Sequence, residues 1–89
     1  MFKIQGCDFY NGSRKVGELR GELFDSHGSK IGSFKGKNIF DKNGHVVGTV
    51  RGDGVYQEGT RITTLTDIRK KIQGQGDMSI AALWLLLVK

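Results

Sequence analysis

Glycine recurs along this chain at intervals of 15 or 16 residues, in three separate series. The series are Gly6, Gly21, Gly36 and Gly52; Gly12, Gly28, Gly44 and Gly59; and Gly17, Gly32 and Gly48. Similarity at a fixed period is the sequence signature of repeat architectures, in which each unit packs on its neighbours. The chain is therefore expected to contain four imperfect repeats of 15 or 16 residues, which begin at residues 4, 19, 34 and 50.

Each repeat is predicted to form a β-hairpin. A unit of this length is too short for a pair of helices, and its apolar residues are spaced for short extended segments. Two units contain the segments DSHG at 25–28 and DKNG at 41–44, which have the Asp and Gly of a type I turn. The glycine series are interpreted as reversals of one antiparallel meander of about eight short strands over residues 2–65. A parallel solenoid with one coil per repeat is the rival architecture.

The turns from Phe24 to Gly28 and from Phe40 to Gly44 share an aromatic residue, an Asp and a Gly. In this pattern they resemble the short hairpin repeats of the tyrosine-aspartate kind. The likeness covers these turns only, and Tyr56 followed by Gln57 departs from it. The resemblance implies a hairpin architecture and no particular function.

A hairpin meander places equivalent residues of successive repeats in columns, about 9.5 Å apart. One edge is expected to carry Gln5, Arg20, Lys35 and Arg51; the opposite edge Asn11, Asp25, Asp41 and Gln57; and one face Tyr10, Phe24, Phe40 and Tyr56. The basic column beside the aromatic column predicts a polyanion-binding surface, with Arg20, Lys35 and Arg51 as candidate residues. A purely structural interpretation explains the same columns as solvated charges and core aromatics.

The last quarter of the chain changes character. Thr66 and Asp67 predict the start of a short helix near 67–73, and the nine apolar residues at 80–88 predict a second helix near 78–88. The second helix would span about 18 Å, too short to cross a bilayer core of about 30 Å. We expect one or both helices to pack on the sheet. Because this segment is apolar on all sides, Ile80, Leu83, Trp84 and Leu87 are candidates for an association surface, and a membrane-surface anchor is a third interpretation.

Composition and motifs narrow the class of protein. A chain of 89 residues with a net charge of +5 is expected to form one domain over residues 1–89, made of the repeat region 2–65 and the helical segment 66–89. One Cys and two His supply neither an internal disulfide nor, without other ligands, a zinc site. His27 and His45 are interpreted as solvated turn residues, and Cys7 as a buried strand residue. The sequence has no common catalytic or cofactor motif, so we expect no enzyme activity, cofactor or metal.

The leading hypothesis is a protein-interaction or structural module whose partner is another protein or a second copy of the chain. An antiparallel meander leaves two unpaired edges, to which another strand can add. Nucleic-acid binding through the basic edge is the alternative, and no small-molecule ligand is inferred. A single Cys favours a reducing compartment, so the expected location is the cytoplasm.

Overall fold

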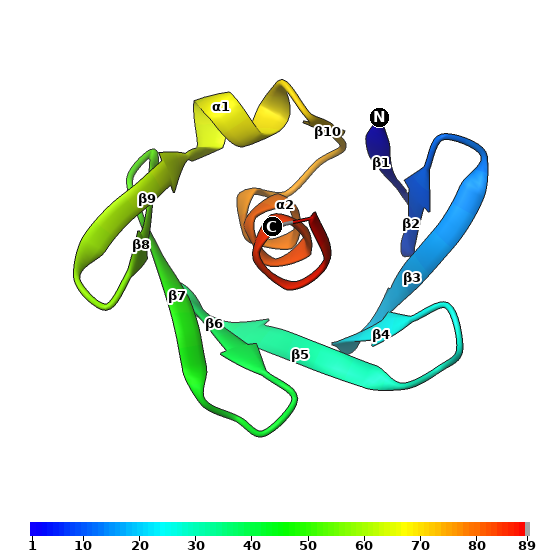
Figure 1. Ribbon diagram of the computed structural model, residues 1–89, viewed down its shortest axis with the longest axis horizontal. Coiled ribbons are helices and arrows are strands. Elements are labelled where there is room, and N and C mark those ends of the chain that lie inside the picture. Colours follow the sequence, from blue (N-terminus) through cyan, green and yellow to red (C-terminus); the bar gives the residue numbers. More distant parts are fainter. Residues whose placement is uncertain (89) are drawn as a thin grey trace.

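Residues 1–88 are described by a computed structural model, in which hairpins form a ring around a central helix (Figure 1). The strands are β1 Phe2–Gln5, β2 Asp8–Asn11, β3 Arg14–Arg20, β4 Glu22–Asp25, β5 Lys30–Lys35, β6 Asn38–Asp41, β7 Val46–Arg51, β8 Gly54–Gln57, β9 Thr60–Thr64 and β10 Ile72–Gln73. The helical segments are α1 Leu65–Arg69, α2 Asp77–Leu83 and the π-helix η1 Trp84–Val88. The strands form one sheet in the order β10-β1-β2-β3-β4-β5-β6-β7-β8-β9, and only β10 runs parallel to its neighbour, β1. The predicted mainly-β antiparallel meander with C-terminal helices packed on the sheet is confirmed.

Two of the three glycine series lie at reversals of the chain. These eight glycines have positive φ, between 60° and 86°, a region that residues with a Cβ adopt at a cost of about 1–2 kcal/mol. The predicted columns at the strand ends are confirmed. Gln5, Arg20, Lys35 and Arg51 end β1, β3, β5 and β7, whereas Asn11, Asp25, Asp41 and Gln57 end β2, β4, β6 and β8.

Each repeat also contains an irregularity that bends the sheet. The register shifts once between β2 and β3, once between β4 and β5, once between β6 and β7, and once between β8 and β9. A β-bulge bends its strand and increases the local twist. Four equivalent shifts therefore curl the sheet into the ring that Figure 1 shows from above.

The third glycine series lies within strands on the inner surface of the ring, so its interpretation as reversals is wrong. Each of these glycines faces a leucine of η1; the pairs are Gly17 with Leu87, Gly32 with Leu86, and Gly48 with Leu85. A Cβ on Gly32 would lie 2.6 Å from Cδ1 of Leu86 and still closer to the carbonyl oxygen of Phe40. Because consecutive side chains point in different directions around a helix axis, the three consecutive leucines reach three successive repeats. These glycines make room for the helix.

The hydrophobic core lies between the ring and α2. The ring contributes one fully buried side chain from each repeat, namely Phe9, Leu23, Ile39 and Val55, and α2 contributes Ile80, Ala81, Ala82 and Leu83. Apolar side chains of the strands surround this helix, which explains why the helix is apolar on all sides. Across residues 1–88, no helix is both long enough and apolar enough to cross a membrane.

The first helix closes the gap between β9 and β10 (Figure 1). It begins earlier than predicted, because the Thr64 side chain, rather than that of Thr66, caps it by accepting a hydrogen bond from the N–H of Asp67 at 3.1 Å. Ile72, predicted to lie in this helix, is a buried residue of β10 and pairs with Phe2. Since α1 lies beside both β9 and β10, the sheet is less open at its edges than the meander predicted.

Candidate functional site

The four predicted aromatic residues lie on the outer surface of the ring. Tyr10, Phe24, Phe40 and Tyr56 are each half-buried, and the residue that precedes each of them along its strand fills the core. Successive residues of a strand point to opposite faces of the sheet, which explains this division. The structural interpretation of these aromatics as core residues is therefore wrong, and they remain accessible to a ligand.

Three of the outer aromatic rings carry a basic side chain. The cation lies 5.3 Å from the ring centroid for Arg20 over Phe24, 5.5 Å for Arg51 over Tyr56, and 5.9 Å for Lys3 over Tyr10. All three distances are within the range of cation–π attraction. The ring of hairpins thus brings the predicted basic and aromatic columns together on its outer surface.

Gly54 supports the contact between Arg51 and Tyr56. A Cβ on Gly54 would lie 2.7 Å from Cε1 of Tyr56, so the ring of Tyr56 lies over this glycine. Gly54 is also the cross-strand partner of Arg51. A guanidinium group held against a ring keeps its N–H groups available to bind an oxyanion in two-point contact.

The charges of the outer surface are arranged unevenly around the ring. Three basic side chains of β3 and β5, namely Lys15, Arg20 and Lys30, have carboxylate partners. Lys15 pairs with Asp8, at 3.2 Å, and with Glu18; Arg20 pairs with Glu18 at 3.0 Å; and Lys30 pairs with Glu22. The predicted site residue Arg20 therefore lies on a surface whose charges are largely balanced.

The opposite part of the outer surface is cationic. It carries Lys35, Lys37, Arg51 and Arg61, and within residues 1–88 none of these four lies in an ion pair. Asp53, the acidic residue in the turn after Arg51, accepts a hydrogen bond from Thr66 at 2.9 Å. We call these four cations, together with Phe40 and Tyr56, the cationic face. It contains two of the three predicted site residues and adds Arg61, which is the cross-strand partner of Tyr56.

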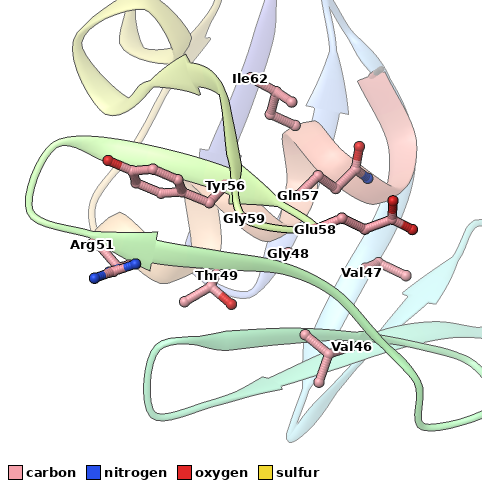
Figure 2. A pocket seen from close by; sticks show the side chains of 10 residues that line it. All are labelled: Val46, Val47, Gly48, Thr49, Arg51, Tyr56, Gln57, Glu58, Gly59 and Ile62. Carbon is pink, nitrogen blue, oxygen red and sulfur yellow. The ribbon is translucent and has the colours of Figure 1, made fainter.

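A groove of about 510 Å³ crosses β7, β8 and β9 beside the cationic face. Figure 2 shows its lining side chains, with Arg51 at one end and Glu58 at the other. Val46 and Ile62 supply apolar lining, and the ring of Tyr56 lies at the Arg51 end. The side chain of Val46 is 55% exposed, whereas most large apolar side chains of the described chain are buried or half-buried.

The histidines and their neighbouring aspartates are turn residues, as expected. Asp41 Oδ1 accepts hydrogen bonds from the N–H groups of His45, at 3.0 Å, and Asn43, at 2.8 Å. The backbone hydrogen bond from His45 is the largest cause that lowers the pKa of Asp41, and the equivalent bond from Ser29 lowers the pKa of Asp25. Among the residues that the structure describes, no group of three or more His, Cys, Asp or Glu side chains could hold a metal ion.

Cys7 lies in the turn between β1 and β2, where it is exposed. The expectation of a buried strand cysteine is therefore wrong. The carbonyl oxygen of Cys7 accepts a hydrogen bond from the N–H of Leu19 at 2.7 Å, which joins this turn to β3.

The predicted association residues divide into two pairs. Ile80 and Leu83 are 0% exposed, because they fill the centre of the ring, so they are not part of an exposed surface. Trp84 and Leu87 are half-buried in η1. Since Leu87 packs near Gly17, which pairs with Asp25, this end of the helix lies toward the Asp25 and Asp41 end of the ring.

Two features of this surface escaped the sequence analysis. Gly54 lies outside the three glycine series, and this irregularity is the signal that could have marked the support beneath Tyr56. Arg61 occupies the position in its repeat that Lys15 and Lys30 occupy in theirs, opposite an outer aromatic residue, and this equivalence is the signal that could have marked it. Comparisons with protein-family models, curated proteins and solved structures found no match to this chain.

Proposed function

We propose that this protein is a non-enzymatic binding module that binds nucleic acid through the phosphates, using the cationic face. The observation that carries this proposal is the uneven charge of the outer surface. Lys15, Arg20 and Lys30 are matched by carboxylates, whereas Lys35, Lys37, Arg51 and Arg61 have no ion-pair partner within the described chain. A row of unmatched cations is the arrangement that neutralises successive phosphates.

The aromatic residues of the cationic face support a single-stranded ligand. Single-strand binders combine a basic track for the backbone with aromatic side chains beside it. Phe40 and Tyr56 lie between the cations of this face, on the outer surface of β6 and β8. The net charge of +5 also favours encounter with a polyanion. A cytoplasmic location is part of this proposal.

Two double variants with the same change of net charge test the proposal. Lys35→Gln with Arg51→Gln removes two cations of the cationic face, and Lys15→Gln with Lys30→Gln removes two ion-paired cations as the matched control. Binding of a fluorescent single-stranded oligonucleotide is measured by anisotropy at several salt concentrations. If each removed cation contacts one phosphate, the logarithmic salt slope falls by about 1.4 in the first variant.

The control variant is expected to keep the salt slope of the wild type, because its two cations are already matched by carboxylates. Equal losses in both double variants would show that only net charge matters. A wild-type protein that does not bind the oligonucleotide would refute the proposal.

Self-association is a second candidate function, favoured by the half-buried Trp84 and Leu87 of η1. Ile80 and Leu83 are enclosed by the ring, so Trp84 and Leu87 are the part of the predicted association surface that a second copy can reach. If they join two copies, dilution should shift the emission of Trp84 to longer wavelength and make it accessible to iodide. Emission and quenching that do not change with concentration, together with a monomeric sedimentation coefficient, would contradict self-association.

A further inference from the structure

The groove across β7 to β9 has opposite charges at its two ends. Arg51 precedes the turn between β7 and β8, and Glu58 lies in the turn between β8 and β9, so the length of β8 separates them. Val46 and Ile62 also line the groove; Val46 is exposed, whereas Ile62 is half-buried and packs against the core as well. These lining residues therefore suit a ligand that is anionic at the Arg51 end, apolar in the middle and a hydrogen-bond donor at the Glu58 end.

The Arg51 end is suited to a phosphate group. The guanidinium lies 5.5 Å from the centroid of the Tyr56 ring, which in turn lies over Gly54. This support limits the orientations of the guanidinium and leaves N–H groups available at its edge. Two of these N–H groups can donate hydrogen bonds to the oxygens of one phosphate. Arg61, the cross-strand partner of Tyr56, adds a second positive charge on the same surface.

The Glu58 end is suited to hydrogen-bond donors. Glu58 lines the groove, is exposed, and has no ion pair within residues 1–88. A carboxylate repels a second phosphate and accepts hydrogen bonds from an amino group. Among the bases, cytosine offers an N4 amino donor at the position where thymine and uracil offer an oxygen acceptor.

We infer that this groove is a subsite for one nucleotide, with the phosphate on Arg51, the base against Val46 and Ile62, and its amino group toward Glu58. The inference rests on the proposed function, which it deepens, because it assigns one position on the cationic face where a base is read. The subsite prefers cytosine to uracil, since only cytosine places a donor opposite Glu58. The other cations of the cationic face contact phosphates.

Titrations of the full chain followed by NMR amide shifts test this subsite. The probes are cytidine monophosphate, uridine monophosphate and inorganic phosphate. We expect cytidine monophosphate to shift the amides of Val46, Tyr56 and Ile62 and to bind at least 3-fold more tightly than uridine monophosphate. Inorganic phosphate should shift the amides near Arg51 only. Equal affinities for the three probes would overturn the inference.

Two variants separate the base from the phosphate. Val46→Phe enlarges an exposed side chain that lines the groove and leaves the charge unchanged, so it should weaken cytidine monophosphate binding at least 5-fold. Glu58→Gln should remove the preference for cytosine while the Arg51 contact remains. Cytidine monophosphate binding that neither variant alters would overturn the inference. Amide spectra of both variants that match the wild type outside the groove show that the fold is retained.

The same variants distinguish failure of the subsite from failure of the proposed function. With a single-stranded oligocytidine, Val46→Phe should weaken binding while the salt slope stays at the wild-type value. A wild-type chain that binds the oligonucleotide with the expected slope, but is unaffected by Val46→Phe, keeps the proposed function and loses the subsite. Tighter binding of the oligonucleotide than of the mononucleotide identifies a polymer as the source of the nucleotide, and equal binding identifies the free nucleotide; both support the subsite.

Discussion

Replacing Gly32 with alanine is expected to destabilise the fold by about 3 kcal/mol, because the new methyl group has no room. It would lie 2.6 Å from Cδ1 of Leu86 and nearer still to the backbone oxygen of Phe40. The leucine can adopt another rotamer, but the carbonyl can move only with its strand. The measurement is the free energy of unfolding in urea for Gly32→Ala and for the wild type.

Gly36→Ala is the matched control for this substitution. Gly36 has φ +60° and no atom within 4 Å of its would-be Cβ. Its replacement should therefore cost only the strain of a left-handed backbone, about 1–2 kcal/mol. If Gly32→Ala and Gly36→Ala lose the same amount of stability, the inward glycines are turn residues like the others and the close approach of η1 is refuted.

Shortening Leu83 to alanine is expected to destabilise the fold by about 2–5 kcal/mol. Leu83 is 0% exposed and lies in α2 at the centre of the ring, where surrounding strands cannot easily collapse into the space left behind. The loss is a large fraction of the total stability of a chain of this size, about 4–13 kcal/mol. Urea unfolding at several protein concentrations measures it.

Leu85→Ala serves as the comparison within the same helical segment. Leu85 is half-buried, so its truncation removes less apolar contact and should cost about 1–2 kcal/mol. A Leu83→Ala variant as stable as the wild type, or one whose stability depends on concentration when that of the wild type does not, would show that α2 does not form the core of its own chain.

The hairpins could be predicted because the chemistry that forms them is local. The segment from Asp41 to Gly44 contains both the acceptor and the glycine that its turn needs, and the structure shows Asp41 accepting from Asn43 and His45. Strand ends and the repeat period follow from such turns. The positions of the strand-end residues Lys35 and Arg51 could therefore be assigned without coordinates.

The arrangement of the tail could not be predicted in the same way. Gly32 and Gly36 are both glycines of a regular series, yet one faces Leu86 and the other forms a turn. The difference depends on a contact between residues more than 50 positions apart, to which no local rule applies. The start of α1 at Thr64 instead of Thr66 is a smaller error of the same kind, because two threonines offer equivalent capping groups and packing selects one.

The candidate site was predicted in outline only. Arg20, Lys35 and Arg51 occupy equivalent positions in the repeat, so the sequence pattern treats them alike. Their environments differ because Glu18 lies 3.0 Å from Arg20, and the other two lie where the outer surface has no carboxylate partner for them within the described chain. Cross-strand pairing decides this difference, and the pairing register follows from bulges that the sequence did not reveal.

The C-terminal helix is enclosed by the hairpins of its own chain, and a nuclear Overhauser measurement can detect this enclosure. In uniformly labelled protein, the Hα protons of Gly17, Gly32 and Gly48 should show cross-peaks to the δ-methyl groups of Leu87, Leu86 and Leu85, in that order. We expect the same cross-peaks at the same intensity after dilution with unlabelled protein, because they arise within one molecule. Cross-peaks that are missing, or that appear only between a labelled and an unlabelled copy, would contradict the enclosed helix.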